Sequence, residues 1–138
     1  MTLNPDVVRT RCTEIEESVV RLERLARVPL DEFLGNQDQL DLACYRLLVA
    51  IEAALALCYH VSARRLRRAP DDYAACFEGL RSAGLIPADL AERLQRMAKF
   101  RNLLVHVYWK IDYRRVHEIL SHDLEDLRAF ETAMAALV

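Results

Sequence analysis

"LLVAIEAALALCYHV", residues 47 to 61, is apolar on nearly every side when it is drawn as a helix. Alanine and leucine dominate the stretch, and both are strong helix formers. A helix without a polar face must be covered on more than one side. The stretch therefore predicts either the central helix of a bundle or a helix with one face closed by a second copy of the protein.

Glu52 is the only charged residue within this stretch. A carboxylate in an apolar helix is rarely buried without a partner, so we expect an ion pair with an arginine rather than a direct part in a site. The stretch is also shorter than the roughly 20 residues that cross a bilayer. We therefore expect no membrane segment.

Capping residues divide the rest of the chain into further helices. Asn4 and Pro5 begin the first, whose apolar residues recur every three or four positions until Pro29. Other start and stop signals predict helices over 37–68, 71–82, 87–109 and 113–137, with Gly84 after the third and Asp112 as the cap of the last. Short links make long neighbours antiparallel, so the chain is predicted to form one all-α domain, residues 1–138, as an antiparallel bundle of about five helices.

Composition narrows the class of protein further. The chain of 138 residues is 53% apolar and 29% charged, with 3 glycines, which fits a globular fold and argues against an all-β one. Its net charge of −2 gives no overall attraction to nucleic acid. No secretory signal is visible, so we expect a cytoplasmic protein. The cysteines have no metal-site spacing and should be small buried residues, and we expect neither metal nor cofactor: Cys12, Cys44, Cys58 and Cys76.

The segment "RNLLVHVYWKID", residues 101 to 112, combines side chains that suit phosphate chemistry. Arg101 presents a planar fork that matches phosphate oxygens, and His106 can give and take protons near neutral pH. Asn102 could orient either group, and Tyr108 adds a hydroxyl. On an ideal helix Arg101 and His106 diverge by roughly 140°. They meet at one substrate only if the helix is irregular or if two chains share a cleft.

These groups suit metal-independent cleavage of RNA, in which the 2′-hydroxyl attacks the adjacent phosphate. That reaction needs one proton taken and one given, whereas each chain supplies one histidine in the segment, so a dimer with paired sites is expected. Spacing alone leaves a second interpretation open, because the end of a buried helix also carries such residues. The residues by themselves predict an all-α domain with a candidate phosphate-handling site.

Arg101, His106 and Tyr108 reproduce the R-x4-H-x-Y signature of the HEPN ribonuclease superfamily. More narrowly, "MAKFRNLLVHVYWKID" resembles the core segment of the HepT family of toxins. "AIEAALALCYHV", from Ala50, resembles its central helix, and "YAACFEGLRSAGLIPADLAERLQRMAKFRN" resembles the segment before the motif. The likeness covers most of 40–120.

The resemblance implies a HEPN-like fold and a homodimeric endoribonuclease of a type VII-like toxin–antitoxin system. Arg101, His106 and Asn102 would be the catalytic residues, in a cleft between the two chains. The expected partner is an MntA-like minimal nucleotidyltransferase that acts as antitoxin. It would transfer AMP to Tyr108, adding bulk and negative charge where RNA must lie.

Two positions depart from the family. Relatives often carry an acidic residue in place of Ala56 and an asparagine in place of Tyr59. An alternative function follows, namely a non-catalytic helical module that binds a nucleotidyltransferase. A third feature lies outside the motif: "ARRLRR", residues 63 to 68, is the only dense basic run, and it is predicted to fall in the last turns of the second helix. Its arginines are candidates for contact with the RNA backbone: Arg64, Arg65, Arg67 and Arg68.

Overall fold

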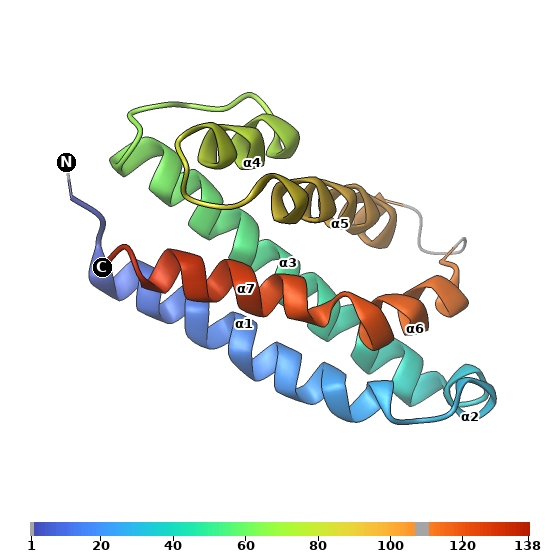
Figure 1. Ribbon diagram of the computed structural model, residues 1–138. Helices are drawn as coiled ribbons and strands as arrows, with labels where there is room; N and C mark the ends of the chain where they lie inside the picture. Colours follow the sequence, from blue (N-terminus) through green and yellow to red (C-terminus); the bar gives the residue numbers. More distant parts are fainter. Residues whose placement is uncertain (1, 107–110) are drawn as a thin grey trace.

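The computed structural model describes residues 2–106 and 111–138, and these form helices connected by short loops, without a strand (Figure 1). The predicted all-α fold is confirmed. The helices are α1 (Pro5–Ala26), α2 (Leu30–Leu34), α3 (Gln37–Arg64), α4 (Tyr73–Ser82), α5 (Ala88–His106), α6 (Tyr113–His122) and α7 (Leu124–Ala135).

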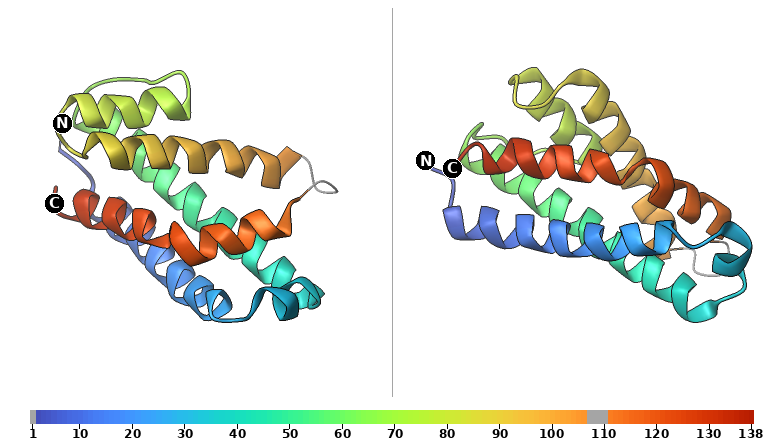
Figure 2. Two further views of the ribbon diagram at one scale, coloured as in Figure 1. Left: turned by 45° about the vertical axis from the view of Figure 1, so that its right-hand side comes forward. Right: turned by 60° about the horizontal axis from the view of Figure 1, so that its bottom comes forward.

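The apolar stretch lies in α3, the central helix of the bundle. Its buried side chains point in several directions, among them Leu47, Ala53 and Leu57, and α3 contacts α1, α4, α5 and α7. Figure 2 shows α1 running beside α3 on one side and α4 with α5 on the other. The 28-residue α3 is long and apolar enough to cross a membrane by length and composition, but half of its most apolar window is buried inside the bundle, as a central helix requires.

Several helix ends follow from the residues that were expected to set them. The Asn4 side chain accepts hydrogen bonds from the backbone N–H groups of Asp6 and Val7, and Pro5 opens α1. Asp112 caps α6 through the N–H groups of Arg114 and Arg115. Gly84 follows α4 with a φ of +77°, a conformation that glycine adopts without strain. The helix predicted from residue 71 instead begins at Tyr73, as α4, and its cap is Asp72, whose side chain accepts a hydrogen bond from the N–H of Ala75.

The structure has more helices than predicted, for two reasons. Residues 30–34, expected as a link, form α2, because Phe33 is fully buried and its ring packs 5.2 Å from that of His117. The last predicted helix is broken at Asp123 into α6 and α7. The apolar spacing continues across that break, from Ile119 to Leu124, so the periodicity gave no sign of it.

The predicted end of the central helix was also wrong. The helix stops at Arg64 rather than Arg68, and Arg67 has a φ of +55°. The turn is closed by backbone bonds from Leu66 to Val61 (3.3 Å) and from Arg68 to Ser62 (2.9 Å). It brings Leu66 into contact with the core. A helix that continued past Arg64 would not make this contact. Three of the four arginines of the basic run therefore lie beyond the helix.

Two further features of the bundle are its cysteines and the position of its chain ends. Cys12, Cys58 and Cys76 are buried in the core as expected, and Cys44 is partly buried. The two ends of the chain lie side by side, since Leu3 and Leu137 line one surface hollow. In Figure 1 these ends are on the left of the bundle, whereas the end of α5 that carries Arg101 and His106 is on the right.

Candidate active site

The Arg101 side chain lies between three helices. It projects from α5, and its Nε donates a hydrogen bond to Oε1 of Glu52 on α3. Its guanidinium carbon lies 5.5 Å from the centre of the Tyr73 ring at the start of α4, within the range of a cation–π contact. Only 18% of the Arg101 side chain is exposed. The arginine is therefore held in one orientation instead of swinging in solvent.

Asn102 completes the setting of Arg101. Its Oδ1 accepts a hydrogen bond of 3.1 Å from Nη1 of the arginine. With Nε bonded to Glu52, the N–H groups of Nη2 have no partner within the described part of the chain. They are left for an oxyanion. The hydrogen bond with Glu52 also raises the pKa of Arg101 above its ordinary value, so the fork stays charged at any physiological pH.

His106 is exposed and is the last residue of α5. The helix is continuous from Ala88 to His106, which rules out the irregular geometry that would have let His106 approach Arg101 within one chain. The two residues are thus roughly 140° apart around α5. The structure brings together Arg101 and Asn102 and leaves His106 on another face. Tyr108 lies outside the described residues.

Glu52 has the arginine partner that was expected, and this partner is Arg101 itself. Glu52 therefore belongs to the candidate site, a role that its sequence context did not favour. Its signal was its position as the only charge in the apolar stretch 47–61. Tyr73 was missed altogether, because a tyrosine at the start of a short helix resembles any other half-buried aromatic residue.

The two departures from the family lie on the same side of α3 as Glu52, one and two turns further along. The Tyr59 ring packs edge-on against that of Tyr73, with 5.7 Å between the ring centres. It thereby supports the ring that faces Arg101. Ala56 is half-buried. The acidic group near the arginine is present in this chain, one turn before Ala56, as Glu52.

An exposed apolar strip leads along α3 to this site. Leu42, Tyr45 and Val49 follow one another at the spacing of one helix face, with Glu52 next in line. Leu42 is 42% exposed and Tyr45 60% exposed. Large apolar side chains exposed along one helix face are typical of a surface that another protein covers.

The basic run lies at the far end of α3. Arg64 is twelve residues beyond Glu52, which corresponds to about 18 Å along the helix. Arg64, Arg65, Arg67 and Arg68 are all exposed, and none forms an ion pair within residues 2–106 and 111–138. The structure does not bring these arginines next to Arg101.

Comparison with known proteins gives matches over almost the whole chain. The family described as Ribonuclease HepT-like matches residues 15–134. A putative RNase of Archaeoglobus fulgidus is 31% identical over 121 residues, which cover 88% of this chain and 85% of that protein. The mRNA nuclease HepT of Shewanella oneidensis is 22% identical over 125 residues, 91% of this chain and 93% of the relative.

Among solved structures, the fold matches that of a tri-AMPylated Shewanella oneidensis HEPN toxin in complex with an MNT antitoxin. The TM-score is 0.87 at 22% identity, over 95% of this chain and 98% of the toxin chain. The family match spans α3 and the Arg101 site. The chain belongs to the HepT-like ribonuclease family.

Proposed function

We infer that the chain is a metal-independent endoribonuclease and the toxin of a type VII-like toxin–antitoxin pair. Arg101 binds the scissile phosphate and stabilises the charge that builds up on it, and Asn102 keeps the guanidinium in place. His106 transfers a proton to or from the reacting oxygens. The observation that supports this most strongly is the position of Arg101, fixed by Glu52, Tyr73 and Asn102 with N–H groups left for an anion.

The active unit in this proposal is a homodimer. Arg101 and His106 lie on different faces of α5, so a substrate reaches both only where a second chain contributes. The strip of Leu42 and Tyr45 on α3 is an exposed apolar surface next to the site, which supports a dimer contact there.

The proposed partner is an MntA-like nucleotidyltransferase antitoxin in the cytoplasm. The related Shewanella oneidensis toxin forms a complex with an MNT antitoxin and carries AMP groups. In this chain the acceptor is proposed to be Tyr108, two residues after His106. AMP at that position would bring negative charge and bulk close to the histidine and repel RNA. Beyond the cleft, the exposed run from Arg64 to Arg68 is proposed to contact the RNA backbone.

Replacement of His106 tests the catalytic proposal. We expect His106→Ala to abolish RNA cleavage, measured on a labelled single-stranded RNA, while its circular dichroism stays helical, because His106 is exposed. His122→Ala, which removes another exposed histidine on α6, is the matched control and should cut normally. Continued cleavage by clean His106→Ala protein would contradict the proposal.

The intact mass of the protein, purified with and without a neighbouring nucleotidyltransferase, tests the proposed regulation. Added AMP mass at Tyr108 together with lost cleavage would support a toxin controlled by modification. Unmodified protein that leaves a broad set of RNAs intact would favour the alternative, a non-catalytic module that binds the nucleotidyltransferase.

A further inference from the structure

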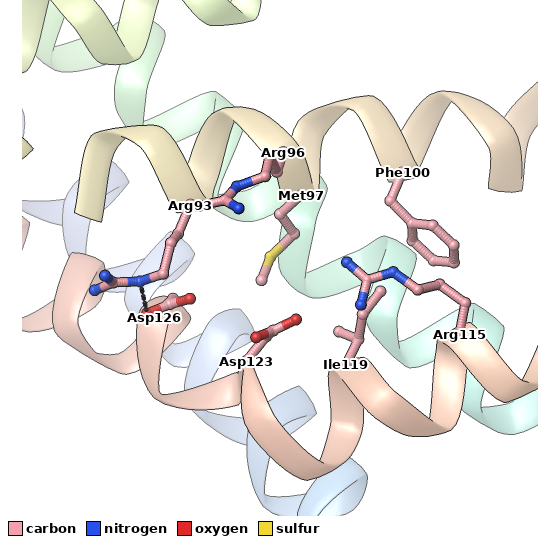
Figure 3. A pocket seen from close by; sticks show the side chains of 8 residues that line it. All are labelled: Arg93, Arg96, Met97, Phe100, Arg115, Ile119, Asp123 and Asp126. Atoms are coloured by element: carbon pink, nitrogen blue, oxygen red, sulfur yellow. Dashed lines mark hydrogen bonds and ion pairs between the residues drawn. The ribbon is translucent and has the colours of Figure 1, made fainter. Parts of the chain in front are cut away.

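A groove runs along α5 on the side that faces α6 and the start of α7. It consists of two adjoining hollows of about 230 Å³ and about 410 Å³, which share Arg96, Phe100 and Arg115. Figure 3 shows the first hollow, with the Arg115 guanidinium pointing into it toward Asp123. We call this feature the α5–α6 groove and define it by Arg96, Lys99, Phe100, Leu103 and Arg115.

Three of these side chains carry positive charge at the rim. Lys99 forms no ion pair within the described residues. Arg96 pairs with Glu92 at 3.6 Å and Arg115 with Glu118 at 3.3 Å, and the side chains of both pairs are largely exposed. Exposed pairs of this kind are weak, so a phosphate can displace the carboxylate.

Arg93, at the other end of the groove, differs from these three. Its Nε donates a hydrogen bond of 2.8 Å to Asp126, whose side chain is only 13% exposed (dashed line in Figure 3). Arg93 is therefore already paired with Asp126, and this ion pair joins α5 to α7. Lys99, Arg96 and Arg115 are the cations that remain available to a ligand.

The floor between the cations is apolar. Phe100 is 7% exposed and forms part of both hollows, and Leu103, Leu104 and Ile111 continue the floor toward the end of α5. Cations along a rim above an aromatic and aliphatic floor are the surface that binds single-stranded nucleic acid, since phosphates follow the charges and bases lie on the floor. Bases that remain stacked inside a duplex cannot reach such a floor.

The direction of the groove connects it with the reaction. Lys99, Leu103 and His106 follow one another along one face of α5 at intervals of four and three residues. Lys99 is therefore about 10 Å from His106 along the helix axis. This face is opposite to the one on which Arg101 contacts Glu52, so the groove approaches the candidate site from the His106 side.

We propose that the α5–α6 groove binds the single-stranded RNA next to the cleaved bond, with Arg96, Lys99 and Arg115 on successive phosphates. This rests on the proposed ribonuclease function. It also assigns a different RNA surface from the run at Arg64, which lies at the far end of α3. Two carboxylates that form no ion pair within the described residues oppose this charge: Asp123 faces Arg115 inside the first hollow, and Asp112 lines the second.

The binding of a fluorescent single-stranded RNA over a range of salt concentrations tests the proposal. All proteins carry His106→Ala, so the RNA stays intact and binding is measured apart from cleavage. The groove variant adds Arg96→Gln, Lys99→Gln and Arg115→Gln. The slope of log K against log salt concentration should become smaller in magnitude by about 2, because three phosphate contacts of roughly 0.7 each are lost. If the lines meet near 1 M salt, this is a loss on the order of 100-fold at 0.1 M salt.

A matched control, called the α1 control, removes three exposed arginines from the end of α1 and the cap that follows it: Arg21→Gln, Arg24→Gln and Arg27→Gln. It makes the same change in net charge away from the groove and should leave the salt dependence nearly unchanged. Asp123→Asn should raise the affinity for the single-stranded RNA, an effect that misfolding cannot produce. The Asp123 side chain makes no capping hydrogen bond at the start of α7, and its neutral form should steepen the salt dependence by up to about 0.7.

Each other outcome has a defined meaning. Equal salt dependence for the groove variant and the starting protein would overturn the proposal, as would an equal loss in the α1 control. A duplex RNA that binds as tightly as the single strand, with the same loss in the groove variant, would also overturn it. The proposal would also be overturned if the groove variant bound RNA normally but no longer bound a nucleotidyltransferase antitoxin, because the groove would then be a protein-binding surface. A protein with wild-type His106 that cuts no RNA would instead contradict only the ribonuclease function.

Discussion

At the scale of single residues, the site depends on what surrounds Arg101. A carboxylate, an aromatic ring and an amide fix the guanidinium from three directions. Lysine has no planar fork and could not satisfy Glu52, Asn102 and a phosphate in the same way. The sequence predicted Arg101, His106 and Asn102 as site residues from their types and from the family resemblance, and it could indicate that Glu52 needs an arginine. It could not identify which one, because the pair is 49 residues apart in the chain.

Glu52 is expected to act as a positioning residue for Arg101. Glu52→Gln keeps a hydrogen-bond acceptor and should lower kcat about tenfold, whereas Glu52→Ala should lower it about 100-fold, with a smaller change in KM. Because the pair is partly exposed, Glu52→Ala should cost roughly 1 kcal/mol in the free energy of unfolding. Cleavage rates at saturating RNA and urea unfolding measure the two effects. Equal kcat for Glu52→Ala and the unchanged protein would remove Glu52 from the site.

Glu131 on α7 makes stability depend on pH. Burial, followed by the nearby charge of Glu16, raises the pKa of Glu131 from 4.5 to about 7. Because the folded state holds this proton more tightly than the unfolded state, the contribution is fully present below pH 4.5 and is lost as pH rises through about 7. The melting temperature should therefore include a decline across this interval that Glu131→Gln removes. A decline of the same size in Glu131→Gln would contradict the assignment to Glu131.

At the scale of helices, the ends that could be predicted are those set by one local residue. Asn4, Asp112 and Gly84 act through their own side chain or backbone, so their role is visible in the sequence. The ends at Arg64 and Asp123 contain neither proline nor glycine. There the chain leaves the helix for reasons of tertiary packing, such as the contact of Leu66 with the core. The local pattern of residues in the sequence does not indicate such contacts.

Asp112 is the helix cap nearest to the candidate site in the sequence, since it begins α6 six residues after His106. Asp112→Ala leaves the N–H groups of Arg114 and Arg115 without their acceptor and should cost about 1 kcal/mol in the free energy of unfolding, seen as a lower urea midpoint. Asp112→Asn retains an acceptor and should lose much less. Equal losses in both variants would indicate that the charge of Asp112, rather than its cap, stabilises α6.

At the scale of the whole molecule, the bundle holds Arg101 inside and His106 outside, on different faces of one regular helix. The sequence predicted this divergence from the spacing of five residues. It left open whether the helix would bend to cancel it, and only the structure excludes that for residues 101–106.

A shared cleft makes a prediction for mixtures. Arg101→Ala and His106→Ala proteins should each be inactive, but mixing them at equal amounts under conditions that let subunits exchange should restore up to about a quarter of normal cleavage. Half of the dimers would then be mixed, and each would contain one site with both residues intact. Gel filtration of the mixture verifies that dimers are present. No recovery in exchanged dimers would show that each site takes Arg101 and His106 from the same chain or needs His106 from both chains.

The meeting of the two chain ends has a consequence for protein engineering. Leu3 and Leu137 border the same hollow, on the side of the bundle away from Arg101. A short peptide bridge between the ends would turn the chain into a closed ring without stretching any helix. Such a ring has fewer unfolded conformations, which in chain-entropy terms stabilises the fold by up to about 4 kcal/mol. The natural loop between α4 and α5 could then be cut at Gly84, which would give a circularly permuted chain with the same bundle and the same site.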